Sequence, residues 1–497
     1  MKKLFACIIA LLMLVPLMAA CEEAGDTSTT SGVVSNATTE NSETELPEVE
    51  VQDMNGREFN VLCYDWSAGS ASILGYTGEI MYDEENPTAV DEAKKLVVDK
   101  IESLYNCTIN GEKTNTVSIV STIKNQVTSG LHFYDIVFDS ISSAASMVPD
   151  GVLLDLNTVE NIDLSDPWWD QNAVKDLSIA NKVYFACGDI NTYDDQGTWC
   201  MLFNKTLKNK LNIEEDFYQL VRDNKWTFDK FKEICKRGYT TDSTGDGILD
   251  EKDTWAFGTE RYNIYVHVLA AGQKISKKDE NDIPYLTVSE EPQATYTILA
   301  DILEFYNDEQ TVMVANTPKY ESKGFPNVWE ATVHPAFVEG RELFYMCGLI
   351  NSASFRVMED EFGILPIPKY YDTQDRYYHT VSVGNSSCMT IPEGTTDVAQ
   401  VGLIVSAIAR ESKLLVTPAY YDVQLKYRDS RDDESGEMLD LIFSTRTFDI
   451  ANAYNWGGIR DQYTNISQSD IASRFDRVIG TVELAMEAFV SKITDEE

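Results

Sequence analysis

The sequence has 497 residues, with 81 acidic side chains against 40 basic ones and a formal net charge of −41 at pH 7. So large an acidic excess argues against nucleic-acid binding, which needs clustered Lys and Arg to neutralise phosphates. It also argues against electrostatic docking onto anionic lipid, and it leaves the binding of a neutral ligand open.

The first segment, residues 1–20, has the layout of a cleaved signal peptide. Lys2 and Lys3 precede an apolar run over residues 4–17, and two alanines stand directly before Cys21. The run is too short and wrongly flanked for a stable membrane span. A cysteine in this position resembles a bacterial lipobox, so we predict that Cys21 is lipidated and holds the protein at the extracellular face of the cytoplasmic membrane. Plain secretion, with Cys21 as a bystander, is the alternative.

Residues 21–50 are expected to form a disordered acidic tether. The segment after Cys21 is rich in Glu, Thr, Ser, Asn and Ala and contains no Lys or Arg. Such a composition cannot bury enough apolar area to offset the entropy lost on ordering. No later stretch approaches the ~20 apolar residues that a membrane span needs.

The body that follows is large enough, at roughly 445 residues, to predict two lobes. Its first elements alternate between strand and helix patterns. They are a strand over 59–64, a helix over 88–105, a strand over 107–109, a helix over 116–129 and a strand over 134–138. This order predicts an α/β fold with a mostly parallel sheet covered by helices, in which ligands bind beyond the carboxyl ends of the strands.

The later elements continue the α/β pattern. A strand is expected over 199–203, and helices are expected over 228–238, 291–307, 396–410 and 470–493. Thr227 is a suitable N-cap for the helix that begins at residue 228.

The body contains a series of short motifs, which are 134–137 (YDIV), 166–169 (DPWW), 181–185 (NKVYF), 203–205 (FNK), 225–231 (KWTFDKF), 255–258 (WAFG), 337–341 (FVEGR) and 362–368 (FGILPIP). In this order and spacing they resemble the extracellular solute-binding proteins of family 1, the sugar-binding components of ABC transporters. The resemblance implies a two-lobed periplasmic-binding-protein-like fold with hinge crossings near residues 200–204, 382–391 and 412–425. It assigns 51–200 and 388–415 to lobe 1, and 201–387 and 416–497 to lobe 2. It further implies a monomer that closes on a carbohydrate, expected to be an oligosaccharide, in the interlobe cleft and delivers it to permease subunits.

A carbohydrate site needs flat aromatic walls and planar hydrogen-bonding groups. Trp66 and Asp65 follow the first strand, where a cleft should open. Asp194, Asp195 and Trp199 stand at the first crossing. Trp456 and Arg460 belong to a glycine-containing loop of the second lobe. We predict that Trp66, Asp65, Asp195, Trp199, Trp456 and Arg460 bind the ligand. Core packing is the alternative for each tryptophan.

The stretch from Asp242 to Asp253 resembles an EF-hand-type calcium loop. Oxygen ligands would come from Asp242, Thr244, Asp246, the carbonyl of Ile248, Asp250 and Asp253. Gly247 stands at the position of the sharp turn. A structural Ca²⁺ ion is therefore predicted, with a solvated acidic turn as the alternative.

No nucleophile, zinc or phosphate-loop motif of an enzyme is present, so binding without catalysis is expected. The abundant carboxylates keep a secreted glycoside hydrolase open as an alternative. A surface lipoprotein with no transport role is a third possibility. The seven cysteines after Cys21 show no close pairing, which predicts buried free thiols.

Overall fold

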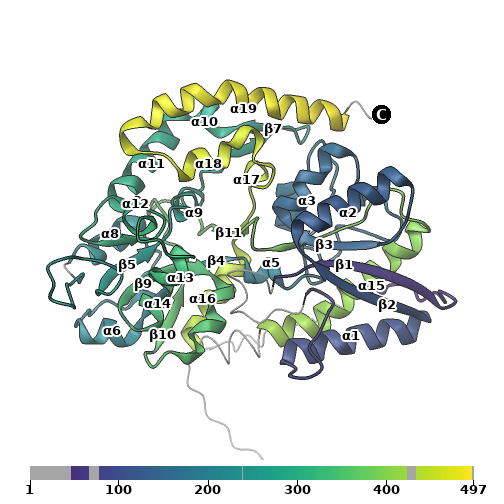
Figure 1. The fold of residues 1–497 in the computed structure, drawn as a ribbon, viewed down its shortest axis with the longest axis horizontal. Coiled ribbons are helices and arrows are strands. Elements are labelled where there is room, and N and C mark those ends of the chain that lie inside the picture. Colours follow the sequence, from purple (N-terminus) through teal and green to yellow (C-terminus); the bar gives the residue numbers. More distant parts are fainter. Residues whose placement is uncertain (1–45, 67–77, 238, 422–431, 495–497) are drawn as a thin grey trace, which may run out of the picture. The chain divides into compact units, whose positions relative to one another are not determined.

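Two β-sheets organise residues 46–66, 78–237, 239–421 and 432–494, the parts of the chain that the computed structural model describes (Figure 1). The first sheet has the strand order β12-β3-β1-β2, and the second has the order β10-β4-β9-β5-β8. Two further pairs, β11-β13 and β6-β7, are separate. The strands are β1 (Arg57–Tyr64), β2 (Cys107–Thr114), β3 (Ile136–Ser140), β4 (Trp199–Asn204), β5 (Trp255–Thr259), β6 (Ser276–Lys278), β7 (Pro284–Leu286), β8 (Val312–Val314), β9 (Glu342–Gly348), β10 (Phe362–Leu365), β11 (His379–Thr380), β12 (Ser387–Thr390) and β13 (Arg446–Thr447).

Nineteen α-helices surround the sheets in the described residues. They are α1 (Ala89–Tyr105), α2 (Thr116–Ser129), α3 (Ile141–Met147), α4 (Gln171–Leu177), α5 (Tyr193–Gln196), α6 (Lys205–Lys210), α7 (Phe217–Arg222), α8 (Phe228–Cys235), α9 (Asn263–Ala270), α10 (Thr287–Glu290), α11 (Pro292–Tyr306), α12 (Pro318–Glu321), α13 (Val328–Ala331), α14 (Val333–Val338), α15 (Val398–Pro418), α16 (Asp433–Ser444), α17 (Ile450–Tyr454), α18 (Ile459–Thr464) and α19 (Ile471–Thr494). The predicted α/β class is confirmed.

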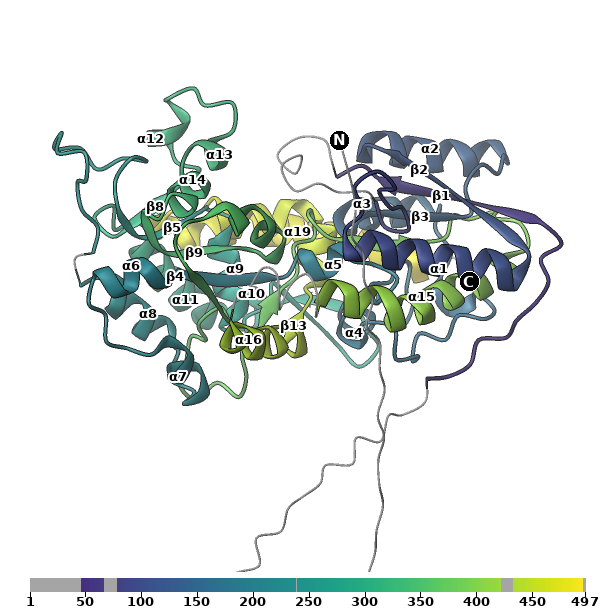
Figure 2. The same cartoon turned by 90° about the horizontal axis from the view of Figure 1, so that it is seen from below.

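The first sheet is parallel except at one edge. Strand β1 pairs in parallel with β2 and β3, and β12 pairs antiparallel to β3. Helices α2 and α3 lie on one face of this sheet and α1 and α15 on the other (Figures 1 and 2). Covered faces explain why β1 and β3 are apolar on both sides. The expected strand at 134–138 begins two residues late, at Ile136, and just before it the Asp135 carboxylate accepts from the Asn60 amide at 2.9 Å.

Local signals in the sequence set the ends of α1. The Thr88 hydroxyl accepts from the Asp91 amide, and the Asp91 carboxylate accepts from the Thr88 amide at 2.8 Å, which is a capping box. Asn106 ends the helix with a φ of 49°. The apolar side chains at 90, 93, 97 and 101 share one buried face, which packs against α15.

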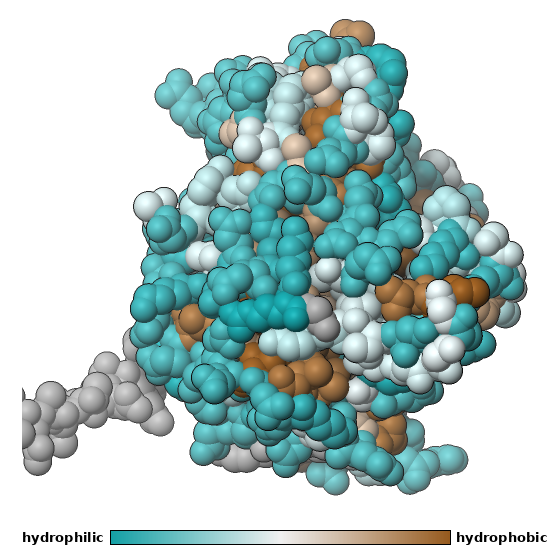
Figure 3. Space-filling view, turned by 90° about the vertical axis from the view of Figure 1, so that its left-hand side faces the viewer, coloured by the Kyte–Doolittle hydropathy of each residue, from teal (hydrophilic) through white to brown (hydrophobic). Residues whose placement is uncertain are grey.

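Aromatic side chains fill the core around the second sheet. Phe203, Phe217, Trp226, Phe231 and Phe344 form a contiguous cluster in which several ring centroids lie 5.1–5.9 Å apart. The outer face of this part of the molecule is largely hydrophilic, with small separate apolar patches (Figure 3). This surface agrees with the strongly acidic composition.

Two chain crossings run side by side between the sheets. The first passes from α5 to β4, where Thr198 forms a bridge with Val381 of the second crossing. The Ser382 amide donates to the Gly197 carbonyl at 2.9 Å. A Cβ on Gly197 would lie 2.8 Å from Ser386 Cβ, so this approach requires glycine. The first crossing therefore precedes the predicted residues 200–204, which lie inside β4.

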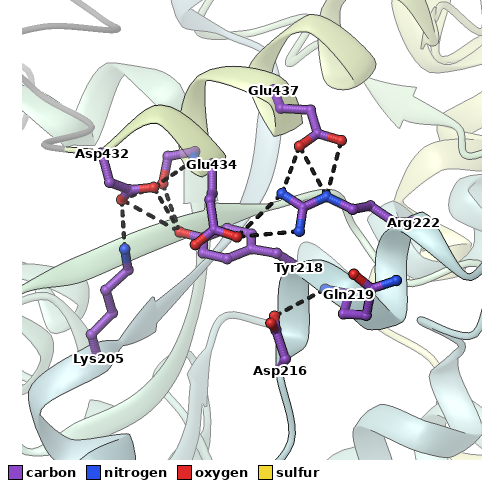
Figure 4. Close-up of polar contacts among 9 residues, drawn as sticks. Lys205, Asp216, Tyr218, Gln219, Arg222, Asp432, Glu434 and Glu437 are labelled. Carbon is purple, nitrogen blue, oxygen red and sulfur yellow. Dashed lines mark hydrogen bonds and ion pairs between the residues drawn. The ribbon is translucent and has the colours of Figure 1, made fainter.

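The third crossing, predicted at 412–425, lies partly outside the described residues. Its described part is the last turn of α15, which was expected to end at 410 and continues to Pro418. Beyond the gap, Asp432 caps α16 and contacts Lys205 at 2.6 Å, and Arg222 contacts Glu434 and Glu437 (Figure 4). These contacts join α16 to α6 and α7.

The C-terminal helix α19 reaches across both parts of the molecule. It lies over α11 and α18 near the second sheet and extends toward the residues 148–150 that follow α3 (Figure 1). Its bounds and those of α11 agree with the predicted helices 470–493 and 291–307 to within a residue. Helix α8 ends at Cys235, short of the predicted 238, and Thr227 caps it as expected.

The signal peptide, Cys21 and most of the predicted tether lie outside the described residues. The described end of that tether, residues 46–50, lies against the body. Arg410 donates to the Pro47 carbonyl at 2.8 Å, and the Tyr105 hydroxyl donates to the Glu50 carbonyl at 3.0 Å. The ordered body thus begins before residue 51. Within the described residues, no helix is both long and apolar enough to cross a membrane.

Candidate functional site

A cavity of about 580 Å³ opens where the edges of the two sheets face each other. This volume falls within the range of small-molecule sites. Its lining residues come from both sheets and from the crossings between them. They are Trp66, Ser142, Gly197, Trp199, Glu260, Tyr262, Asn327, Trp329, Cys347, Gly348, Ile350, Asn351, Ser382, Val383, Gly384, Asn385, Arg460 and Asp461.

Strand direction explains why these residues meet. Trp66 and Ser142 follow the carboxyl ends of β1 and β3, and Glu260 and Gly348 stand at the carboxyl ends of β5 and β9. Strand β4 runs antiparallel to β9, so its first residue, Trp199, lies at the same edge as Gly348. The cavity thus lies beyond the carboxyl ends of the parallel strands of both sheets, as expected for α/β folds.

Four aromatic side chains wall the cavity. The rings of Trp199 and Tyr262 have centroids 5.7 Å apart, and Trp66 packs edge-on against Tyr64 at 4.4 Å. Trp329 donates its indole N–H to the Tyr345 hydroxyl at 2.7 Å, which fixes the plane of its ring. Flat rings of this kind can pack against the apolar C–H face of a sugar.

Polar groups stand between the rings. Asn351 donates to the Gly348 carbonyl at 3.3 Å, and the Ser382 hydroxyl accepts from the Asn385 amide at 3.2 Å. Arg460 donates to the Asn452 carbonyl at 3.3 Å, and its Nε lies 3.8 Å from the Asp461 carboxylate. The cavity therefore offers both donors and acceptors to a hydroxyl-rich ligand.

Glu260 is a carboxylate in the cavity lining whose pKa is raised. It is half-buried, and no ion pair or hydrogen bond joins its side chain to another described residue. Burial raises the pKa of Glu260 to about 7. A ligand that donates a hydrogen bond to this partly buried carboxyl group would stabilise the complex, because the group has no other described partner.

Three of the six residues predicted to bind ligand line this cavity, namely Trp66, Trp199 and Arg460. The structure places the other three elsewhere. Asp65 points toward Lys113 at 3.9 Å. Trp456, in the 3-10 helix η6 (Trp456–Gly458), is only 5% exposed and stacks on Tyr454 with a centroid distance of 5.2 Å. Its ring is core packing.

Asp195 belongs to a buried cluster of charges centred on Arg446. The guanidinium contacts Asp170 and Asp195, and Asp194 lies 3.7 Å away. Burial raises the pKa of Asp195 to about 6 and that of Asp194 well above its ordinary value. Arg446 therefore joins β13 to α4 and α5, next to the first crossing. A second cavity of about 400 Å³ touches this cluster.

The predicted calcium loop is held by its own backbone. The two oxygens of Asp242 accept from the Gly245 and Gly247 amides at 2.6 and 2.8 Å. Asp253 is fully buried and accepts from the Ser243 and Asp250 amides, both at 2.8 Å. Lys323 pairs with Asp250 at 3.0 Å, and Asp246 accepts from the Ile248 amide at 2.9 Å. Thr244 donates to Asp242. Among the described residues, no group of three or more His, Cys, Asp or Glu side chains is placed to hold a metal ion.

Sequence reasoning missed several cavity residues. Glu260 and Tyr262 follow the WAFG strand, so the carboxyl-end rule already used for Trp66 would have found them. Trp329 and Asn327 lie in a short helix and the loop before it, and no periodic pattern marks them. All seven described cysteines are buried and free, which confirms that prediction; Cys347 alone reaches the cavity wall.

Comparisons with known proteins define the fold. No protein-family model matches the sequence, and no curated protein matches it either. Among solved structures, an ABC substrate-binding protein of Listeria monocytogenes in complex with cycloalternan is similar over 89% of this chain and 100% of its own, with a TM-score of 0.53 and 11% identity. A cyclo/maltodextrin-binding protein complexed with maltotetraose is similar over 89% and 97%, with a TM-score of 0.53 and 11% identity. A sugar transporter protein of Rhizobium etli in an open conformation is similar over 88% and 100%, with a TM-score of 0.53 and 13% identity.

These likenesses confirm the predicted two-lobed α/β fold of periplasmic binding proteins. At such low identity they establish fold alone, so a function must be argued from the cavity.

Proposed function

We propose that the protein captures a carbohydrate between its two lobes and delivers it to the permease of an ABC transporter. The observation that carries the proposal is the cavity of about 580 Å³ at the carboxyl ends of strands from both sheets. Three tryptophans and a tyrosine form its walls. The fold supports it, since the similar solved structures include proteins holding cycloalternan and maltotetraose.

The geometry suits binding by closure. The lining residues Trp66 and Ser142 belong with the first sheet, whereas Glu260 and Trp329 belong with the second. A ligand that touches both sets favours the closed arrangement of the lobes over the open one. The paired crossings at Gly197 and Ser382 are the segments about which such a motion would turn.

Delivery requires the protein to stay near its permease. We propose export by the segment 1–20, lipidation at Cys21 and retention as a monomer at the extracellular face of the cytoplasmic membrane. Support comes from the sequence pattern before Cys21. Replacing Cys21 with Ser should move the protein from the membrane fraction to the medium, and continued membrane retention would contradict the anchor.

Binding without turnover is part of the proposal. Hydrolysis of a glycosidic bond uses a pair of carboxyl groups, and Glu260 and Asp461 are the carboxylates among the residues that line the cavity. Mass analysis of a bound oligosaccharide after long incubation separates the two functions. An intact ligand agrees with transport, and shortened products would favour a hydrolase.

We also propose that the loop from Asp242 to Asp253 binds a structural Ca²⁺ ion. Ligand spacing supports the proposal, as do the φ angles of 73° at Gly245 and 83° at Gly247, which curl the backbone toward Asp242. Binding would require Asp246 and Asp250 to turn inward and Lys323 to leave Asp250.

The experiment that tests the carbohydrate site is calorimetric titration of the compact unit Leu46–Glu497 with mono- and oligosaccharides. We expect Trp199→Ala and Trp329→Ala each to weaken binding about tenfold or more, because each removes one wall of the cavity. Tyr371→Ala is the control, since Tyr371 is 45% exposed and lies outside the cavity lining. Undiminished affinity in both tryptophan variants would place the ligand elsewhere.

A further inference from the structure

The charges that line the main cavity do not balance. They are the side chains of Glu260, Arg460 and Asp461. Arg460 and Asp461 lie 3.8 Å apart on the same helix and offset each other, and Arg460 also donates to the Asn452 carbonyl. Glu260 forms no ion pair with a described residue. Among the described side chains, the Glu260 carboxylate is therefore left without a counter-charge.

The neighbours of Glu260 do not supply that counter-charge. The titratable side chains that interact with it electrostatically are Tyr306 on α11 and Tyr345 and Cys347 on β9. Burial raises the pKa of each of these groups above its ordinary value, so all three are neutral at pH 7. Desolvation alone accounts for the raised pKa of Glu260. The net charge of −41 adds a negative field over the whole chain.

The aromatic walls favour a cation as well as a sugar ring. Tyr262 follows Glu260 by two residues and lies beside Trp199, with ring centroids 5.7 Å apart. The faces of such rings attract an ammonium group, most strongly where water is excluded. A ligand that carries both apolar C–H faces and a positive charge therefore matches the rings and the unpaired carboxylate together.

We propose, building on the carbohydrate-binding function above, that the cavity prefers a carbohydrate with a protonated amine, and that Glu260 is the residue that pairs with this amine. Glu260 then sets specificity, because a neutral sugar can engage the rings but leaves the carboxylate without a charged partner.

The test uses matched sugars that differ only in the amine. Glucose, galactose, mannose and the β-1,4 oligomers of glucose are titrated beside their 2-amino-2-deoxy counterparts at about pH 7, where Glu260 is partly ionised and the sugar amines still carry protons. We expect the amino form of the bound sugar to bind about tenfold more tightly than its hydroxyl form. Glu260→Gln should remove the preference, so that the amino and hydroxyl forms of the sugar bind this variant with affinities within about threefold of each other. Asp99→Asn, which removes a charge at an exposed site on α1, is the control.

A pH series adds an independent readout. As the pH rises from about 5.5 to about 7.5, Glu260 ionises and affinity for the amino sugar should rise in the native protein but not in Glu260→Gln. Equal affinity for both members of every pair, or a preference for the neutral sugar, would overturn this inference and leave the carbohydrate function intact. Absence of binding by any sugar would overturn both.

Discussion

The Glu342 carboxylate lies directly against Gly258 on the neighbouring strand. A Cβ added at Gly258 would lie 2.1 Å from Glu342 Oε1. Glu342 is fully buried, and neither of its oxygens has a hydrogen-bond partner. Burial raises the pKa of Glu342 well above its ordinary value, although Arg341 opposes the shift. The second sheet therefore contains a carboxyl group that is more stable in its protonated form.

This raised pKa predicts a pH-dependent gain in stability for Glu342→Gln. The folded protein holds the proton more tightly than the unfolded chain does, so the stabilising contribution is present below about pH 4.5 and is lost as the pH rises toward the folded pKa. We expect Glu342→Gln to be more stable than the native protein at pH 7, and nearly equal to it at about pH 4. Urea unfolding at both pH values measures this, and an equal effect at both would contradict it.

The contact also predicts that residue 258 must be glycine. Gly258→Ala should destabilise the fold by about 1–3 kcal/mol, since a methyl group would push Glu342 out of place. Combining it with Glu342→Ala should recover most of the loss, because the clashing atoms are then absent. Additive losses in the double variant would mean that another neighbour causes the effect.

The cluster around Arg446 predicts a sharp contrast between two arginines. Arg446→Gln leaves Asp170, Asp194 and Asp195 buried without a cation and should cost about 3–5 kcal/mol. Arg222→Gln breaks two pairs with exposed glutamates (Figure 4) and should cost under about 1 kcal/mol. Thermal unfolding of both variants beside the native protein measures the difference. Similar losses would show that the buried cluster is not stabilised by its arginine.

The position of Trp456 predicts a loss of stability without a loss of ligand affinity. Its ring stacks on Tyr454 and packs against Phe489 at 5.6 Å, away from the cavity lining. Trp456→Ala should cost about 3–5 kcal/mol through the void it leaves. Affinity for the sugar, measured well below the lowered Tm, should match the native value. Weaker binding by the folded variant would show that Trp456 contributes to the ligand site.

The proposed calcium loop predicts a metal-dependent Tm. Calcium at about 100 times its Kd should stabilise the folded protein by ~2.7 kcal/mol, and a chelator should reverse the change. Asp246→Asn should abolish the response, whereas Glu280→Gln, at an exposed site outside the loop, should keep it. A Tm that is the same with calcium and with chelator would mean that backbone hydrogen bonds alone hold the loop.

The sequence predicted much of the fold because most elements are marked locally. The apolar periods of α1 and α19 and the cap at Thr227 each lie within a few neighbouring residues. The order of strands within a sheet, by contrast, is not marked by neighbouring residues. Strand β12 joins the first sheet beside β3, and their side chains and carbonyls contact across 249 residues of sequence. No local pattern specifies such a partner.

Those residues of the candidate site that lie at the ends of recognisable strands could be predicted from the sequence. Trp66 and Trp199 follow or begin recognisable strands, and both line the cavity. The sequence places Trp456 next to two glycines, which predicts a loop. Only the packing of Tyr454 and Phe489 around its ring shows that the side chain turns inward. Trp329 reaches the cavity through a four-residue helix whose position depends on tertiary contacts.

The late arrival of β12 has a consequence for how the chain folds as it is made. Strand β3 cannot be covered on its outer edge until the residues that form β12 have emerged, 249 positions later in the sequence. Until then the edge of this apolar strand has unpaired backbone groups that can pair with another unfolded chain, which is a route to aggregation. Pairing over such a separation is also slow, because a long loop must close first. In the export proposed above, the chain would pass through a membrane from its N-terminus, and this delay would keep the first sheet unfinished until β12 had crossed.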